Sequence, residues 1–312
     1  MPAVPAVPAV PTAAVAPALR LPGQPRSPDL LCVGAQKAGT TWLHTVLAHH
    51  PGFWLPPFKE IDYFTDPGAN LSWKFQAMHH QMSLQVKAGK IDLPTMRWWS
   101  ELCLAERMDV AWYRRLFAPA GARVTGEVSP NYTGLSPAQA ARAREVCPDA
   151  KIIVMLRDPI DRVWSMARMM HRAGRLSALD GPALEACVLA PEAVAWSDYW
   201  RLLATWEGAF GPDRVLVLFY EELERSPLAV VERICGFFGV PFRPAAVASL
   251  AQQRFNDAPQ APLPPALAAA LAQRLRAPTQ ALARRYPAEA GPYLERLLAA
   301  LPRAPTAAPA PR

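Results

Sequence analysis

The chain has 312 residues, 51% of them hydrophobic, so it can bury the core of one large α/β domain or of two smaller ones. Its formal net charge of +7 favours anionic ligands such as nucleotides, but the arginines are too spread out to predict a nucleic-acid partner. Five scattered cysteines without a CxxC pair indicate reduced structural thiols in a cytoplasmic protein, and the absence of a run of about 18 apolar residues excludes a transmembrane helix.

The N-terminal segment, residues 1–27, is rich in Pro and Ala and predicts an extended, disordered arm. Its frequent prolines and its lack of a basic start exclude the helical apolar core of a signal peptide. Residues 303–312 repeat this composition, so we expect a disordered tail there and a single domain over residues 28–302.

The stretch Leu30–Leu43 predicts a strand, a tight loop and a helix in succession. Leu30–Val33 is a short buried apolar run, Gly34 and Gly39 bound the loop, and helical spacing of apolar residues follows. In this layout the loop amides and the helix N-terminus point at one spot and attract an anion. Lys37 adds a full positive charge inside the loop.

The loop differs from a Walker A sequence in the position of its lysine. Gly34 and Gly39 have the Walker spacing, but Thr40 stands where that motif has its Lys, and Lys37 lies inside the loop instead. A cation at this position suits a ligand with one phosphate that carries a further group, rather than the outer phosphates of a triphosphate. The stretch resembles the 5′-phosphosulfate loop of sulfotransferases that use 3′-phosphoadenosine 5′-phosphosulfate (PAPS). An ordinary strand-to-helix turn is the alternative, and the later motifs decide between the two.

A short segment, Phe58–Phe64, follows the first helix, which Pro51 ends. We expect an ordered loop or edge segment beside the Gly34–Gly39 loop, with Glu60 among aromatic residues as a candidate catalytic carboxylate. A surface Lys-Glu pair is the alternative. The chain resembles heparan-type and related bacterial sulfotransferases, which have Lys-Glu and two aromatic residues at this distance, and the resemblance implies Glu60 as the base. Asp62 stands where part of that family has a His.

Residues 70–118 are dense in aromatic side chains, which we interpret as core ahead of an acceptor pocket. The large residues there are Trp73, Met78, Met82, Trp98, Trp99, Trp112 and Tyr113. The pairs His49–His50 and His79–His80 lack the spacing of a metal site on a helix face, so we predict no metal.

The stretch Arg123–Tyr132 predicts a strand that runs into a loop. It resembles the family's Gly-Glu-Lys-Thr/Ser-Pro-x-Tyr segment, which borders the acceptor site. Val128 replaces the lysine, which makes a heparan-like acceptor less expected. For Glu127 two interpretations stay open: it orients a nearby Lys or Arg, or it closes a structural ion pair.

The run Ile152–Leu156 predicts a buried parallel strand because it is unbroken and rich in β-branched residues. Asp158 and Pro159 fit the N-cap and the first position of a helix. Ligands of a doubly wound sheet bind beyond the carboxyl ends of the strands, so Arg157 is expected at the same edge as the Gly34–Gly39 loop. There its guanidinium can hold a phosphate through two hydrogen bonds, and Ser165 can add a third. The stretch resembles the family's 3′-phosphate motif, Arg-Asp-Pro-x-x-Arg-x-x-Ser; a merely capped helix does not explain the Arg-to-Ser spacing.

The rest of the chain continues the alternation of strands and helices. Residues 191–210 predict one amphipathic helix, Arg214–Tyr220 another parallel strand, and Gly239 the end of the following helix. From about residue 263 an Ala/Leu/Arg-rich helical region is expected to pack on the sheet. Arg254 lies near the place where the family has a basic nucleotide-binding segment.

These elements predict an α/β fold: a single P-loop-type domain with a central parallel sheet flanked by helices. The resemblance implies transfer of a sulfuryl group from PAPS to an acceptor hydroxyl, with Glu60 as base, Lys37 offsetting charge, and no metal. The donor-binding residues that it implies are Lys37, Ala38, Gly39, Thr40, Thr41, Trp42, Arg157, Ser165 and Arg254.

The acceptor stays open between a sugar hydroxyl, a lipid headgroup and a small secondary metabolite, and the oligomeric state is open too. A P-loop kinase or NTPase is one alternative function; it predicts a Lys at position 40 and a magnesium-binding Asp after a later strand, where this chain has Thr40 and Arg157. A non-catalytic nucleotide-binding module of a larger assembly is the other.

Overall fold

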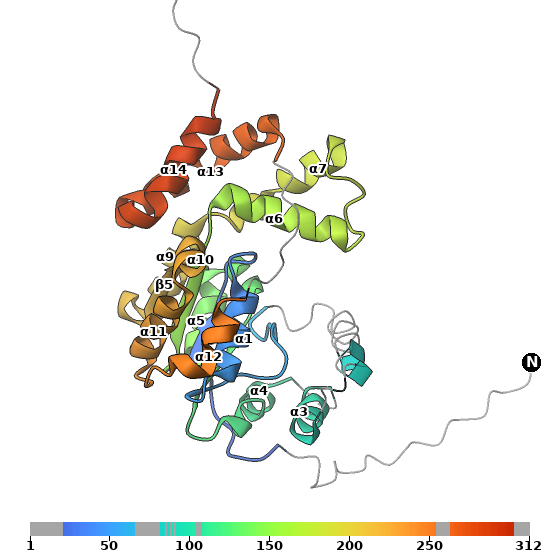
Figure 1. Ribbon diagram of the computed structural model, residues 1–312, viewed down its shortest axis with the longest axis vertical. Helices are drawn as coiled ribbons and strands as arrows, with labels where there is room; N and C mark the ends of the chain where they lie inside the picture. The colour runs from blue at the N-terminus through green and yellow to red at the C-terminus, as the bar shows by residue number, and fades with distance from the viewer. Residues whose placement is uncertain are drawn as a thin grey trace, which may run out of the picture.

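The computed structural model describes residues 21–65, 82–84, 86–87, 89, 92–103, 108–253 and 263–302. Within these residues, five parallel strands form one sheet in the order β2-β3-β1-β4-β5. Figure 1 shows the sheet surrounded by helices. The strands are β1 (Leu30–Cys32), β2 (Phe53–Trp54), β3 (Val124–Val128), β4 (Lys151–Leu156) and β5 (Val215–Phe219). The predicted α/β fold with a central parallel sheet is therefore confirmed.

The central strands β1 and β4 are neighbours, so the two sequence motifs that follow them leave the sheet side by side. Leu30 pairs with Lys151 and Cys32 with Ile153. Both strands are almost fully buried, as their unbroken apolar runs predict for a parallel sheet with helices on both faces.

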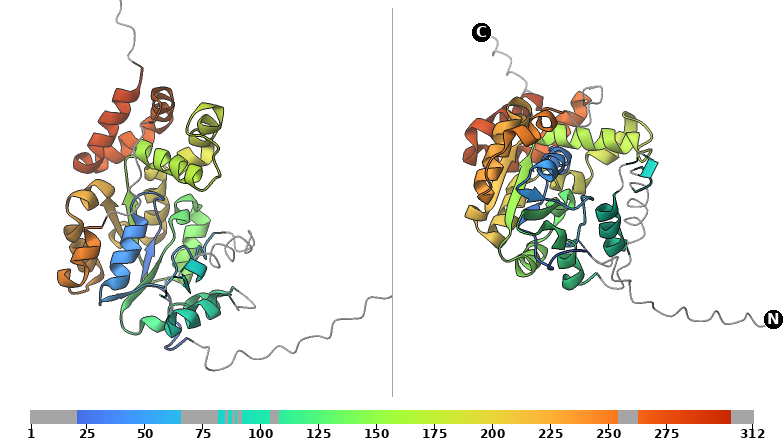
Figure 2. Two further views of the ribbon diagram at one scale, coloured as in Figure 1. Left: turned by 45° about the vertical axis from the view of Figure 1, so that its right-hand side comes forward. Right: turned by 60° about the horizontal axis from the view of Figure 1, so that its bottom comes forward.

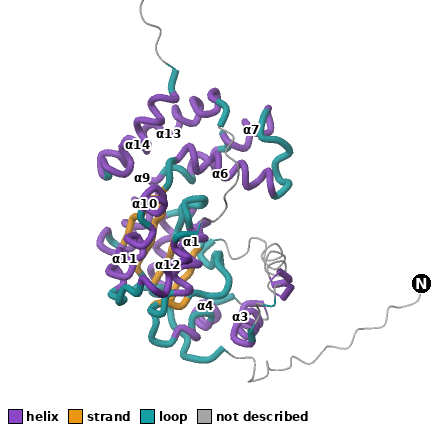
Figure 3. The backbone as a smooth tube through the Cα atoms, viewed as in Figure 1, coloured by secondary structure: helices purple, strands orange, loops and turns teal. Residues whose placement is uncertain are grey.

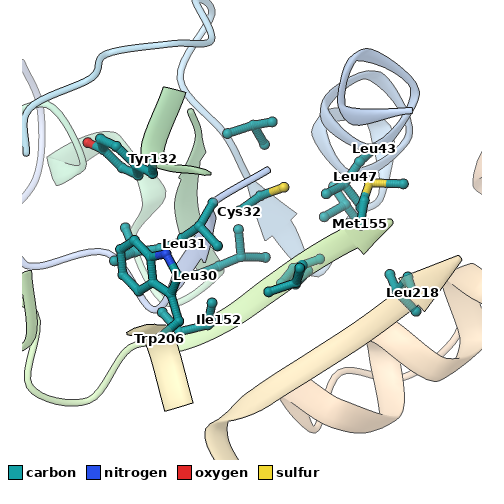
Figure 4. Close-up of a cluster of buried hydrophobic side chains, with 14 of the residues drawn as sticks. Leu30, Leu31, Cys32, Leu43, Leu47, Tyr132, Ile152, Met155, Trp206 and Leu218 are labelled. Carbon is teal, nitrogen blue, oxygen red and sulfur yellow. The ribbon is translucent and has the colours of Figure 1, made fainter. Parts of the chain in front are cut away.

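Helices cover both faces of the sheet (Figure 2). One layer contains α1 (Thr40–His49), α11 (Pro227–Phe238) and α12 (Pro244–Ala251), and the other contains α5 (Pro137–Val146) and α9 (Tyr199–Phe210). Figure 4 shows part of the main core, with Leu43 and Leu47 of α1 on one side of the strands and Trp206 of α9 on the other. The remaining elements of this body are α3 (Leu93–Cys103), α4 (Val110–Arg115), α10 (Tyr220–Arg225) and the 3₁₀ turns η2 (Ala118–Ala120), η3 (Pro130–Gly134) and η4 (Pro212–Arg214).

A second hydrophobic core lies between helices that Figure 3 shows together at one end of the molecule. It joins α6 (Pro159–Arg172), α7 (Gly181–Val188), α13 (Pro265–Arg285) and α14 (Pro287–Ala300), which we call the helical cluster. The prediction that the region after residue 263 packs on the sheet is only partly right. Tyr286 and Tyr293 contact Phe219 at the end of β5, but the rest packs chiefly on other helices.

The single helix predicted over residues 191–210 is wrong, because the chain breaks between α8 (Pro191–Ala195) and α9. The Asp198 side chain accepts a hydrogen bond from the Arg201 amide at 3.0 Å and so starts a new helix. Just before it, the buried Ser197 hydroxyl accepts from Arg162 Nε of α6 at 2.5 Å. A tertiary contact thus fixes a break that helical periodicity does not reveal.

The aromatic residues predicted as core are buried wherever the structure describes them, namely Trp98, Trp99, Trp112 and Tyr113. Trp73 and Met78 lie outside the described residues, as do residues 1–20 and 303–312 of the predicted arm and tail. All five cysteines are free thiols, and Cys103 on α3 is exposed. In the described part of the chain, every helix is too short or too polar to cross a bilayer.

Candidate active site

The Gly34–Gly39 loop extends the pairing of β1 with β4. Ala35 N–H donates to Met155 O and Met155 N–H donates to Gly34 O, both at 2.6 Å. Gly39 closes the loop with φ 94°, and a Cβ there would meet Leu223 Cδ2 at 2.9 Å, so this position requires glycine. Since no described side chain caps α1, its first-turn amides are available to an anion.

Lys37 projects from this loop into a group of positive charges. Its backbone has φ 72°, a left-handed conformation that residues other than Gly rarely adopt. Burial, together with the positive charges of four neighbours, lowers the pKa of Lys37 to about 8; the neighbours are Arg172, Lys59, Arg157 and Arg168. Such a concentration of cations is stabilised when an anion binds among them.

Arg157 connects the second motif to the first. It follows β4, and its Nη1 donates to the Lys37 carbonyl at 3.2 Å. Its guanidinium also lies over the Tyr220 ring, 4.5 Å from the centroid, which restricts its orientation. The structure therefore brings Lys37 and Arg157 together at the carboxyl edge of the sheet, as the sequence predicted; their donor-binding roles stay predictions.

Helix α6 begins as predicted. The Asp158 side chain caps it by accepting from the amides of Ile160 and Asp161 at 2.9 and 3.0 Å, and Pro159 is its first residue. Ser165 is half-buried two turns further on.

Arg168 and Arg172 are candidate site residues that sequence analysis missed. With Ser165 they have the spacing i, i+3, i+7, which places all three on one face of α6. That periodicity was a visible signal, because it continues from a serine already assigned to the motif.

The predicted ordered loop at residues 58–64 is confirmed, and it lies against α1. Lys59 Nζ is 2.7 Å from Glu60 Oε1 and donates to Thr41 Oγ1 at 3.3 Å. The Lys-Glu pair of the alternative interpretation therefore exists, but it is tied to the helix that follows the Gly34–Gly39 loop. The Glu60 side chain is 37% exposed, so its carboxylate remains accessible. Phe58 packs against Trp99 of α3, with ring centroids 5.5 Å apart.

Both sequence interpretations of Glu127 are wrong. The residue is 1% exposed, and its carboxylate accepts three hydroxyl hydrogen bonds; it pairs with no Lys or Arg of the described ranges. The donors are Tyr132 at 2.6 Å, Tyr113 at 2.7 Å and Ser129 at 3.1 Å. Burial raises the pKa of Glu127 to about 7, although these hydroxyls act in the opposite direction. The neighbouring Val128 side chain is fully buried.

The other residues predicted to bind the donor differ in how far they are buried. Trp42 is buried and its indole N–H donates to Ala251 O at 2.9 Å, so its side chain is committed to the interior. Ala38 within the loop and Thr40 at the start of α1 are buried. Arg254 lies outside the described residues. Across the ranges that the structure describes, His, Cys, Asp and Glu form no group of three that could hold a metal ion.

Comparison with known proteins identifies the family. Residues 28–244 match the model of the sulfotransferase family. The chain is 33% identical to human sulfotransferase 2B1 over 101 residues, which are 32% of this chain and 28% of that protein. It is 24% identical to bifunctional heparan sulfate N-deacetylase/N-sulfotransferase 1 of Caenorhabditis elegans over 223 residues, 69% of this chain and 22% of that protein. These matches span only about a quarter of each relative's length.

The fold is also similar to that of a solved sulfotransferase from Alicyclobacillus acidocaldarius. The TM-score is 0.50 at 24% identity, over 89% of this chain and 97% of the other. Because the family model covers the Gly34–Gly39 loop, the Lys59–Glu60 pair and the start of α6, this chain belongs to the sulfotransferase family.

Proposed function

We propose that this chain transfers a sulfuryl group from PAPS to an acceptor hydroxyl, with Glu60 as general base and without a metal ion. The hydrogen bond from Arg157 to the Lys37 carbonyl supports this proposal most strongly. PAPS carries phosphate groups at both ends of its ribose, and a site for it needs cations from two places in one small region.

The Gly34–Gly39 loop and the first turn of α1 bind the 5′-phosphosulfate. The uncapped amides of the first turn of α1, Thr40–Trp42, donate to its oxygens, and Lys37 Nζ adds a charge-assisted bond. Arg157 and Ser165 bind the 3′-phosphate, and Arg254 is assigned to the same nucleotide. Arg168 and Arg172 add positive charge, which favours association with a multiply charged anion.

Glu60 takes the proton of the acceptor hydroxyl as its oxygen attacks sulfur. The bond between sulfur and the bridging phosphate oxygen breaks, which leaves adenosine 3′,5′-bisphosphate (PAP). Lys37 offsets the negative charge that grows on that oxygen. By analogy with phosphoryl transfer, positioning and electrostatics carry the reaction, and the general base contributes on the order of 10²- to 10⁴-fold in rate.

The test is transfer of labelled sulfate from PAPS to a metabolite extract of the source organism and to a panel of sugars, phenols and lipids, with product mass as readout. Glu60→Gln is expected to lose turnover yet keep its affinity for PAP in calorimetry. Glu207→Gln is the matched control, because it makes the same change in a carboxylate paired with Arg285 on a different helix.

Near-normal turnover of Glu60→Gln would remove Glu60 from the role of base. Magnesium-dependent turnover of ATP would favour a kinase or NTPase. Binding of PAP without transfer to any acceptor would favour a non-catalytic nucleotide-binding module.

A further inference from the structure

The segment Lys59–Phe64, here called the Glu60 segment, has no regular secondary structure but is held at alternate amides. The bonds run from Glu60 N–H to Val128 O at 3.0 Å, from Asp62 N–H to Ser129 Oγ at 3.2 Å and from Phe64 N–H to the Tyr132 hydroxyl at 3.2 Å. Val128 ends β3, Ser129 follows it and Tyr132 belongs to the turn η3. The segment therefore lies along β3 like an added strand, but side-chain hydroxyls replace two of the backbone acceptors.

Local backbone preference opposes this conformation. Glu60 has φ 67° and Asp62 has φ 56°, so two non-glycine residues are left-handed within one short segment. Such conformations persist where the surrounding structure determines them, and they cluster at functional sites. Here Asn131 Nδ2 adds a bond to Asp62 Oδ2 at 2.7 Å, so tertiary contacts hold the segment in place.

Glu127 fixes the two hydroxyls on which the segment depends. Ser129 donates to Glu127 Oε2 at 3.1 Å and Tyr132 donates to Oε1 at 2.6 Å. Each hydroxyl has one proton. While that proton points to the Glu127 carboxylate, the lone pairs of the hydroxyl oxygen face the amides of the Glu60 segment. An ionised carboxylate only accepts, and this enforces the same direction for both hydroxyls.

We propose that Glu127 is a positioning residue: through Ser129 and Tyr132 it fixes the backbone of the Glu60 segment, and with it the direction of the Glu60 carboxylate. The inference rests on the proposed function, because it gives Glu60 the role of base. Glu127 itself is fully buried and touches no reactant.

The proposal predicts a pH dependence. Glu127 is faced by Tyr113 of α4, Tyr132 of η3, Asp62 of the segment and Cys147 after α5. Burial raises its pKa to about 7. As pH falls through this range, Glu127 takes up a proton on Oε2 and donates it to Ser129 Oγ. The Ser129 hydroxyl proton then loses the acceptor that fixed its direction. Turnover of the parent is therefore expected to fall as pH drops through about 7, and Glu127→Gln to lose this inflection of the profile.

The decisive comparison uses three hydroxyl deletions: Ser129→Ala, Tyr132→Phe and the matched control Tyr113→Phe. Tyr113 donates to the same Oε1, but its ring, which stacks on Tyr63 with centroids 4.2 Å apart, is retained in Phe. We expect Ser129→Ala and Tyr132→Phe to lower kcat in the sulfate-transfer assay by about 10- to 100-fold, because a small displacement of a catalytic group costs that much. KM for PAPS is expected to stay within about twofold, and Tyr113→Phe to retain kcat within about threefold.

Hydrogen exchange of the amides at residues 62 and 64 measures the positioning without any acceptor. Faster exchange in Ser129→Ala and Tyr132→Phe, but not in Tyr113→Phe, supports the proposal. Parental exchange or parental kcat in both test variants would overturn it, as would an equal loss of kcat in Tyr113→Phe. If a deletion variant fails to fold, the pH profile of Glu127→Gln decides: an unchanged inflection overturns the proposal. Loss of turnover in Glu60→Gln alone would leave the proposed function intact while this inference fails.

Discussion

The Gly34–Gly39 loop and helix α6 supply the two halves of one cationic site, yet they stand on different hydrophobic cores. The loop belongs to the sheet, where Ala35 and Met155 exchange backbone bonds with it. Helix α6 buries Val163 and Trp164 in the helical cluster. Arg157, which lies just before α6, joins the two halves directly through its bond to the Lys37 carbonyl.

The two halves are also fixed by different means. Backbone geometry holds the loop, since a side chain at Gly39 would collide with Leu223. Side chains hold α6: Arg162 bonds to Ser197 and to the Ala193 carbonyl, and Arg296 pairs with Asp161 through two 2.7 Å contacts. We call the Gly34–Gly39 loop the 5′ half of the site, and Arg157 with α6 the 3′ half, after the phosphates that our proposal assigns to them. We infer that the 5′ half is rigid with the sheet, whereas the position of the 3′ half depends on the packing of the helical cluster. Ligands that differ only in the 3′-phosphate can separate the two halves.

The largest effect on binding is expected for Arg157→Ala. Loss of a bidentate phosphate contact should weaken the binding of PAP by roughly 100-fold, or about 3 kcal/mol. The affinity for 5′-AMP, which lacks the 3′-phosphate, should stay within about twofold of the parent. Calorimetry with both nucleotides measures this. Arg157→Lys keeps the charge but not the planar fork, so it should fall between parent and Ala. Equal losses for PAP and 5′-AMP would place Arg157 in the 5′ half.

Lys37→Met is expected to weaken the binding of PAP and of 5′-AMP alike, by roughly 10- to 100-fold, because both nucleotides carry the 5′-phosphate that our proposal assigns to Lys37. The same titrations measure the effect. The exposed Lys87 on the surface provides the control, Lys87→Met, which should bind both nucleotides like the parent. Unchanged binding of 5′-AMP by Lys37→Met would contradict the assignment of the loop to the 5′ end.

The pH dependence of PAP binding should report Lys37. Its pKa of about 8 in the free protein rises when a phosphate binds beside it, since the anion favours the charged amine. Below pH 8 both states hold the proton and affinity is constant. Above pH 8 only the bound state holds it, so affinity falls by at most about tenfold per pH unit. Lys37→Arg stays protonated and should show no such fall; a fall of equal size in that variant would assign the titration to another group.

The smallest effect on binding is expected for Arg162→Met, which detaches α6 from the junction of α8 and α9. It leaves Ser197 and the Ala193 carbonyl without their buried donor, at a cost of about 1–3 kcal/mol in unfolding free energy. The affinity for PAP should fall by about threefold and the affinity for 5′-AMP should not change, because only the 3′ half shifts. The control is Arg274→Met, which removes a bond to the Leu189 carbonyl between exposed groups. A loss of 5′-AMP affinity would show that the two halves do not respond separately.

The elements predicted correctly are those with strong local signals. The strand before Gly34, the cap at Asp158 and the end of α11 at Gly239 each depend on a few adjacent residues, and the sheet follows from unbroken apolar runs. The proximity of Lys37 and Arg157 was predictable in the same way, because each motif carries its own spacing and the carboxyl edge of a parallel sheet brings both together.

The features that sequence analysis missed depend on contacts between distant residues. The break at Ser197 is set by Arg162, which is 35 residues away. The partners of Glu127 come from α4 and η3, and hydroxyl donors have no charge pattern that would announce them. A carboxylate in a sequence indicates a partner of opposite charge, and only the fold reveals three neutral ones.

The exposed thiol of Cys103 has a practical consequence. Cys32, Cys147 and Cys235 are buried and Cys187 is half-buried, so a maleimide fluorophore should couple preferentially to α3. One helical turn earlier, Trp99 contacts Phe58, the residue directly before Lys59. A dye at Cys103 would therefore report movement of the surroundings of Glu60 optically, in real time, without modifying Lys37, Arg157 or Ser165.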